Sequence, residues 1–219
     1  MKLLINLTIL TLLTSCSVLN SNNIAPGYKA AYKNINLYFF PEDNSLITPE
    51  VIKEIPYASL LIKLGRTGKN LVILESIKDD TYTYLSSDSV YISIKSGRVI
   101  KTAGLKNNLI EFNEPLSINE FNFSNNQYIK NILFYSYDSP ELIRLKVESI
   151  TQDKGLETVD LFTSKMELRR YEETLTQDYL GWKVTNKFWL DEDGFIWKSI
   201  QYISPKLPPI EIIVTKKPA

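Results

Sequence analysis

Apolar and polar residues alternate along much of the chain, which is the pattern of strands with one buried face. Residues 70–77 and 81–86 alternate on either side of Asp79-Asp80 and predict a β-hairpin. Residues 90–95 place apolar side chains at every second position, and Ser96-Gly97 then supplies a turn before a returning strand at 98–103. The first part of the chain therefore reads as an antiparallel meander.

The second half continues in the same way. Strands are predicted at 142–150, with Ile143, Leu145 and Val147 on one face, and at 158–163, 167–176 and 210–215. The clearest hairpin joins 182–190 to 195–203 through Asp191-Glu192-Asp193-Gly194. If these four residues form the loop, Phe188 lies opposite Trp197 as a cross-strand aromatic pair.

One short helix interrupts this pattern near residue 50. Thr48 can cap it, Pro49 suits its first turn, Glu50 complements the helix dipole, and Pro56 ends it. Many strands with one or two short helices predict a mainly β fold, either an antiparallel β-barrel or a strongly curved sheet.

The first residues have the features of an export signal. Residues 1–15 carry Lys2 and an apolar run that is shorter than the roughly 20 residues a membrane-spanning helix needs. Leu13-Thr14-Ser15-Cys16 looks like a lipobox, in which cleavage before Cys16 frees a residue that carries diacylglycerol and an N-acyl chain. The alternative is an ordinary secretory signal beside a chance cysteine, but Cys16 is the only cysteine, which favours the lipid-bearing role.

These features predict three segments: a removed signal peptide at 1–15, the lipidated Cys16 with a polar tether at 16–27, and a single β-rich domain at 28–219. Two or more acyl chains hold a protein permanently at a membrane. Ser17 stands where aspartate would resemble an inner-membrane retention signal, so we expect the periplasmic face of the outer membrane.

Composition narrows the chemistry. The formal net charge is +0, so no basic excess drives nucleic-acid binding. The chain has no histidine, which removes the commonest general base and transition-metal ligand. Apart from the lipid on Cys16, we expect no cofactor and no metal. Carboxylate, lysine, tyrosine or Ser-Lys chemistry stays open, but the balance favours a protein that binds or assembles over an enzyme.

Two sets of residues are candidates for contact with a glycan or a partner. Arg66, Arg98 and Lys101 lie near Gly65 and Gly104, which suit close backbone approach, and could meet an acidic ligand. The alternative is that they occupy turns and solvated strand faces.

The second set is Trp182, Trp189 and Trp197 on the last hairpin, whose flat rings could stack on sugars. Trp182 and Trp189 are seven residues apart and point to opposite faces of a regular strand, so packing is the alternative for at least one of them.

Three blocks carry a resemblance to a known family: IPYASLLIKLGR at 55–66, SGRVIKTAGL at 96–105, and NKFWLDEDGFIWKSIQYISPKLPPIEI at 186–212. In this order, behind a lipobox, they resemble the group 4 capsule polysaccharide lipoprotein family of GfcB/YjbF type. The resemblance implies an outer-membrane lipoprotein with a β-barrel-like domain that takes part in capsule or exopolysaccharide production or export. It carries over no catalytic residue.

We therefore expect a non-catalytic accessory protein that binds polysaccharide or another protein of the export machinery. Two alternatives remain open. The first is a periplasmic enzyme acting on glycan through two carboxylates roughly 5–9.5 Å apart. The second is a carrier of lipid or lipoprotein, which requires an apolar cavity in place of a filled core.

Overall fold

The computed structural model describes residues 47–113 and 128–218. The predicted signal peptide, Cys16 and the tether lie outside these residues. The compact unit that contains the described residues spans Pro41–Ala219. Its elements are α3 (Pro49–Glu54), β1 (Ser59–Leu64), β2 (Asn70–Lys78), β3 (Thr81–Ser86), β4 (Tyr91–Lys95), β5 (Arg98–Ala103), β6 (Leu109–Asn113), β7 (Ile129–Asp138), β8 (Glu141–Asp160), β9 (Lys165–Gln177), the 3₁₀ turn η3 (Asp178–Leu180), β10 (Trp182–Leu190), β11 (Ile196–Gln201) and β12 (Ile210–Lys216).

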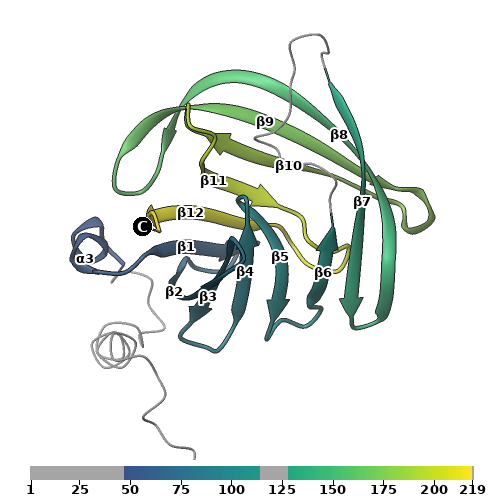
Figure 1. Ribbon diagram of the computed structural model, residues 1–219, viewed down its shortest axis with the longest axis horizontal. Helices are drawn as coiled ribbons and strands as arrows, with labels where there is room; N and C mark the ends of the chain where they lie inside the picture. The colour runs from purple at the N-terminus through teal and green to yellow at the C-terminus, as the bar shows by residue number, and fades with distance from the viewer. Residues whose placement is uncertain (1–46, 114–127, 219) are drawn as a thin grey trace, which may run out of the picture. The chain divides into compact units, whose positions relative to one another are not determined.

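Within the described residues, the strands form one antiparallel sheet in the order β5-β4-β3-β2-β1-β12-β11-β10-β9-β8-β7-β6. Strands β1 to β5 make one meander and β6 to β12 make another (Figure 1). The ladder between β1 and β12 joins them, with Leu60 opposite Val214 and Leu64 opposite Ile210. The two ends of the described chain therefore leave from the middle of the sheet.

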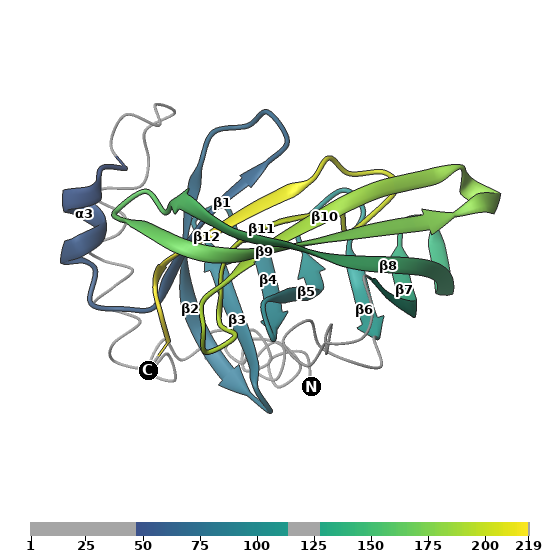
Figure 2. The same ribbon diagram turned by 90° about the horizontal axis from the view of Figure 1, so that it is seen from above.

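The two edge strands, β5 and β6, lie side by side and nearly close the sheet into a barrel (Figures 1 and 2). They share no ladder among the described strands, but the backbone N–H of Leu109 donates to Oγ1 of Thr102 at 3.0 Å. The predicted fold class, a mainly β fold built as an antiparallel barrel or a strongly curved sheet with one or two short helices, is confirmed, and the sheet is a nearly closed barrel. No helix of the described ranges is both long enough and apolar enough to span a membrane.

The local signals that predicted turns and the helix are also confirmed. Thr48 caps α3, its Oγ1 accepting from the N–H of Val51 at 3.4 Å. Asp79 and Asp80 have φ of 49° and 59°, the left-handed conformation that two-residue hairpin turns require. Ser96 and Gly97 have φ of 47° and 74° and join β4 to β5 in the same way.

Strands β8 and β9 continue beyond their neighbours as a two-stranded arm. The arm passes over β11 and β12 in both views (Figures 1 and 2). Glu157 on the arm accepts a hydrogen bond from Nε1 of Trp189, and Nζ of Lys69 lies 4.8 Å from the Phe162 ring centroid. Leu61, Ile73 and Ile213 are also buried, although they point away from the barrel core.

The barrel interior is apolar except for a bridge of polar side chains. Its core includes Leu60, Val72, Leu133, Leu175 and Ile212. Across this core, Arg98 of β5 donates to Glu173 of β9 through both terminal nitrogens, at 2.8 and 2.9 Å. Asn186 of β10 also donates to Glu173, at 3.0 Å.

Gln201 of β11 extends this bridge to the edge of the sheet. Its Nε2 donates to the Gly97 carbonyl at 2.9 Å, and its Oε1 accepts from the Val99 N–H at 3.1 Å. One side-chain amide thus satisfies two backbone groups at edge strand β5, as a neighbouring strand would. The interior polar groups tie β5 to the opposite wall.

Two predictions of register are wrong. Phe188 lies opposite Ser199 instead of Trp197, because the loop has five residues, 191–195, and the β10–β11 pairing shifts by one more residue between Trp189 and Leu190. In β8, Ile143 does not share the buried face of Val147, and 58% of Ile143 is exposed. Arg144 adopts φ of 54° at a pairing irregularity, which reverses the alternation there.

Candidate functional site

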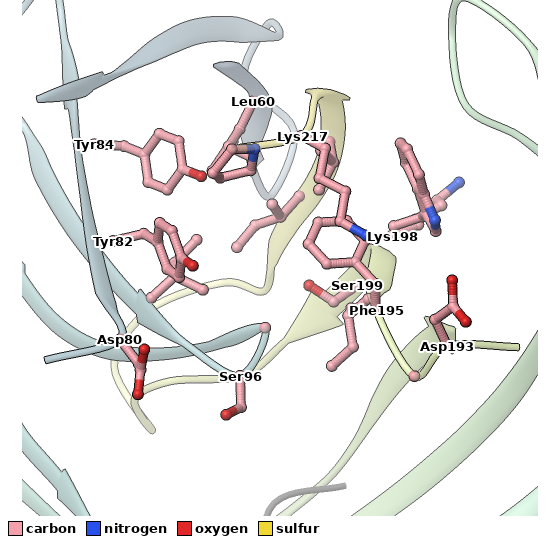
Figure 3. A pocket seen from close by; sticks show the side chains of 18 residues that line it. Leu60, Asp80, Tyr82, Tyr84, Ser96, Asp193, Phe195, Lys198, Ser199 and Lys217 are labelled. Atoms are coloured by element: carbon pink, nitrogen blue, oxygen red, sulfur yellow. The ribbon is translucent and has the colours of Figure 1, made fainter. Parts of the chain in front are cut away.

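A pocket of about 370 Å³ opens at one end of the barrel. Strand β3 forms one wall, the loop before β11 forms another, and the residues after β12 complete it (Figure 3). This is the end at which β1 begins and β12 finishes, since Ser59 pairs with Lys216. The volume lies within the range of about 300–1,000 Å³ that is common for small-molecule sites.

Two tyrosines of β3 supply the first wall. Tyr82 and Tyr84 are two residues apart, so both point to the interior face, and Figure 3 shows their hydroxyls directed into the pocket. Tyr84 is only 3% exposed, and its burial, with a smaller contribution from Tyr82, raises the pKa of its hydroxyl. Within the described ranges, neither hydroxyl has a hydrogen-bond partner in the protein.

The opposite wall is aromatic and is positioned by Asp191. The Asp191 carboxylate accepts from the Phe195 N–H and from Nε1 of Trp197, both at 2.8 Å. These two rings meet edge to face with centroids 5.2 Å apart. Nζ of Lys217 lies 4.2 Å from the Phe195 centroid. The acidic segment that was predicted as a turn thus also orients two aromatic side chains.

The charges around the pocket are unequal. Asp80 and Asp193 are exposed at its rim, and Lys217 is the cation that Figure 3 shows within it. Lys198 also lines the pocket, but its Nζ lies 3.3 Å from Glu211 and 5.5 Å from the Trp189 ring, both on the outer face. The space therefore holds two carboxylates and one ammonium group.

A smaller pocket, of about 170 Å³, lies at the other end of the same half of the barrel. It is lined mainly by apolar residues, including Ile62, Leu64 and Ile210. Between the two pockets the core side chains of β1, β2 and β12 fill the interior. The structure places two end pockets there, separated by packed residues.

The six predicted contact residues lie in different environments. Arg66 and Lys101 are exposed, and Trp197 lines the large pocket. Arg98 is 2% exposed, held by Glu173, with Phe188 and Phe112 on its guanidinium at 4.8 and 5.6 Å. Its environment is the interior of the barrel, away from any acidic ligand in solvent.

Trp182 and Trp189 are both buried. Trp182 packs in the barrel core, edge to face with Tyr135 at 5.9 Å, whereas Trp189 lies on the outer face beside Lys198. The two rings point to opposite faces, as their spacing predicted, and both are used in packing. Of the six candidates, Trp197 is the one at the pocket.

Four pocket residues, Tyr82, Tyr84, Phe195 and Lys217, were not predicted as candidates. The tyrosines had a signal, because two aromatic residues at alternate positions of a predicted strand must share a face. Phe195 and Lys217 had none, since strand pairing between distant segments brings them to β3.

The acidic residues form no cluster suited to a metal: the described ranges contain no group of three or more His, Cys, Asp or Glu in that arrangement. Glu172 and Glu173 point to opposite faces, as expected for neighbours on a strand. Glu173 is occupied by Arg98 and Asn186, and Glu172 lies near Lys154 and Lys187 on the outside.

Comparison with known proteins identifies the family, which the geometry of the pocket alone does not. The model of a family described as "Group 4 capsule polysaccharide lipoprotein gfcB, YjbF" matches residues 32–214. The uncharacterized lipoprotein YjbF of Escherichia coli K12 is 24% identical over 174 residues, covering 78% of this chain and 80% of YjbF. The uncharacterized lipoprotein GfcB of the same organism is 24% identical over 182 residues, covering 81% and 84%.

The same architecture occurs in a solved structure. The crystal structure of the hypothetical lipoprotein YmcC from Escherichia coli K12 superposes with a TM-score of 0.65. The match covers 86% of this chain and 95% of YmcC at 21% sequence identity. At that level of identity the similarity establishes the fold alone.

Proposed function

Since this chain belongs to the group 4 capsule polysaccharide lipoprotein family, we propose that it is an accessory, non-catalytic lipoprotein of capsule or exopolysaccharide production or export. The observation that carries this proposal is the family match over residues 32–214, which includes most of the barrel. The proposed role is to bind glycan or another protein of the export machinery.

The proposed location is the periplasmic face of the outer membrane, with Cys16 as the lipid-bearing residue. The lipobox at 13–16 and Ser17 support it. A three-chain lipid anchor would keep the barrel at the membrane where polysaccharide is exported.

A binding role agrees with the side chains that the barrel provides. The large end pocket presents aromatic rings and hydroxyl groups, which are groups that contact sugars, and its two acidic residues lie at an exposed rim. The strongly buried carboxylate, Glu173, is held in an ion pair inside the core. These features favour recognition over carboxylate-based hydrolysis.

Deletion of the gene tests the role in the cell. We expect surface polysaccharide to fall on deletion and to return when the intact gene is supplied in trans. A Cys16→Ala chain, which cannot be lipidated, is expected to leave the outer-membrane fraction and to restore less polysaccharide. Unchanged surface polysaccharide after deletion would contradict the proposed function.

A further inference from the structure

We propose that the large end pocket binds an uncharged sugar residue of a glycan, with Tyr84 as the inner hydrogen-bonding group. This inference rests on the proposed function, which it narrows to a class of ligand and a place of binding. It uses the side chains of β3, the loop before β11 and the segment after β12.

The first reason is the Tyr84 hydroxyl. More than nine-tenths of this side chain is buried, yet its hydroxyl points into the pocket and has no partner within the described ranges. A hydroxyl at a pocket wall without a partner in the protein can hydrogen-bond a ligand, and a ligand group that displaces water there without replacing its hydrogen bonds loses affinity. A ligand with hydroxyl groups that fills the pocket would satisfy Tyr84, whereas an acyl chain would leave it unmet.

The second reason is the pairing of aromatic faces with hydroxyl groups. Tyr82 and Tyr84 face Phe195 across the space in Figure 3. A sugar ring has apolar C–H faces and a polar edge, so it matches a site with rings on its walls and hydroxyl groups around them. Asp191 holds the Phe195 segment in place through its hydrogen bond to the Phe195 N–H.

The third reason is charge. Asp80 and Asp193 at the rim can accept hydrogen bonds from sugar hydroxyls, and they repel carboxylate or phosphate groups. Lys217 offsets one of these charges, and the Lys198 ammonium is turned towards Glu211 on the outer face. A net negative rim thus disfavours an acidic sugar.

The fourth reason is size. At about 370 Å³ the pocket is near the lower limit of small-molecule sites, which run from about 300 to 1,000 Å³. The packed core below it prevents a long chain from threading through. The site therefore suits one sugar residue, or the end of a glycan, more than an extended stretch of polymer.

Binding to fragments of the cell's own polysaccharide tests this inference. Partial acid hydrolysis of polysaccharide from the producing cells yields fragments that anion exchange separates into neutral and acidic pools. The full-length lipoprotein in detergent is titrated with each pool and with dodecanoate, and binding is followed by calorimetry. We expect binding of the neutral pool and weaker or no binding of the other two.

Tyr84→Phe is the decisive variant because it keeps the ring and removes the hydroxyl. Loss of this hydrogen bond should weaken binding of the neutral pool about fivefold to tenfold. Tyr137→Phe is the matched control: the Tyr137 hydroxyl is buried without a partner in the described part of the chain, but it lies in the core and does not line the pocket. Binding of the neutral pool to Tyr137→Phe should be the same as to the unsubstituted protein.

A second variant, Phe195→Ala, removes an aromatic wall and should weaken binding as well. Tighter binding of the acidic pool or of dodecanoate, an absence of binding to the neutral pool, or equal affinities in Tyr84→Phe and Tyr137→Phe would each overturn the inference. Reduced polysaccharide on gene deletion without neutral-pool binding refutes this ligand and retains the proposed function. Binding of the neutral pool together with unchanged polysaccharide on gene deletion retains this ligand and refutes the proposed function.

Discussion

Arg98 and Glu173, which are 75 positions apart in the sequence, form a bidentate ion pair in the interior of the barrel. Both side chains are almost completely buried, at 2% and 0% exposure. Because Arg98 belongs to edge strand β5 and Glu173 to β9, the pair joins walls that are far apart in the sheet order. The pair also explains why an arginine on an alternating strand faces inwards.

Removing one partner of this pair should destabilise the fold strongly. In Arg98→Ala the Glu173 carboxylate stays buried without its cation, which costs about 3–5 kcal/mol of the free energy of unfolding. Urea unfolding measures the loss. The exposed Arg66→Ala is the control and should change stability little, and equal stability of the two variants would contradict the prediction.

Gln201 should stabilise the edge strand beside this pair. Gln201→Leu removes the acceptor of the Val99 N–H and the donor to the Gly97 carbonyl, so we expect a loss of about 1–3 kcal/mol. Hydrogen exchange gives the specific measurement: the Val99 amide should exchange faster. Gln152→Leu, at a glutamine that accepts a hydrogen bond from exposed Lys154, should leave that amide protected.

Gly97 and Gly181 provide a matched pair of alanine substitutions. Both have positive φ, of 74° and 60°, but a Cβ on Gly97 would lie 2.4 Å from Ile196, whereas a Cβ on Gly181 has nothing within 4 Å. Gly181→Ala should cost about 1–2 kcal/mol from backbone strain alone. Gly97→Ala adds overpacking of about 1–3 kcal/mol, so its thermal midpoint should fall further. Equal midpoints would refute the close contact.

Alkaline pH should unfold the protein through its buried tyrosines. Burial raises the pKa of Tyr137 above its ordinary value, so the folded state keeps a proton that the unfolded state releases above about pH 10. The contribution of protonated Tyr137 to the free energy of unfolding is therefore fully present below that pH, and it falls as the pH rises further. Urea unfolding at several alkaline pH values measures the slope, which Tyr137→Phe should reduce. An unchanged slope in this variant would contradict the assignment.

Turn chemistry and alternation made much of the fold predictable. Asp79-Asp80 and Ser96-Gly97 tolerate positive φ, and Thr48-Pro49 begins a helix, so these short signals specify their own conformations. Strands 81–86 and 98–103 were predicted at their observed bounds. By contrast, β7 has apolar residues on both faces, since Ile132 and Phe134 alternate with Leu133 and Tyr135, so it lacks a clean alternation of apolar and polar residues.

Long-range geometry was not predictable in the same way. The five-residue loop and the one-residue shift that place Ser199 opposite Phe188 depend on the pairing of two strands, and nothing in either strand's composition indicates them. Arg98 carries no local sign of its distant partner, and an arginine is rarely buried unless it is paired. Phe195 and Lys217 line the same pocket as Tyr84 because pairings between distant strands, such as β1 with β12, bring these segments together.

The two edge strands, β5 and β6, are consecutive and lie at the middle of the chain, so the chain can be cut between them into two pieces. Residues 104–108 connect the two meanders but belong to no ladder, so a break there would leave every strand pairing of the described sheet intact. The β1–β12 ladder and the side-chain bonds of Arg98 and Gln201 would still join the two meanders, and none of them needs a continuous chain. Two separately expressed pieces, cut in this loop, should therefore be able to reassociate into one barrel, each contributing part of the pocket.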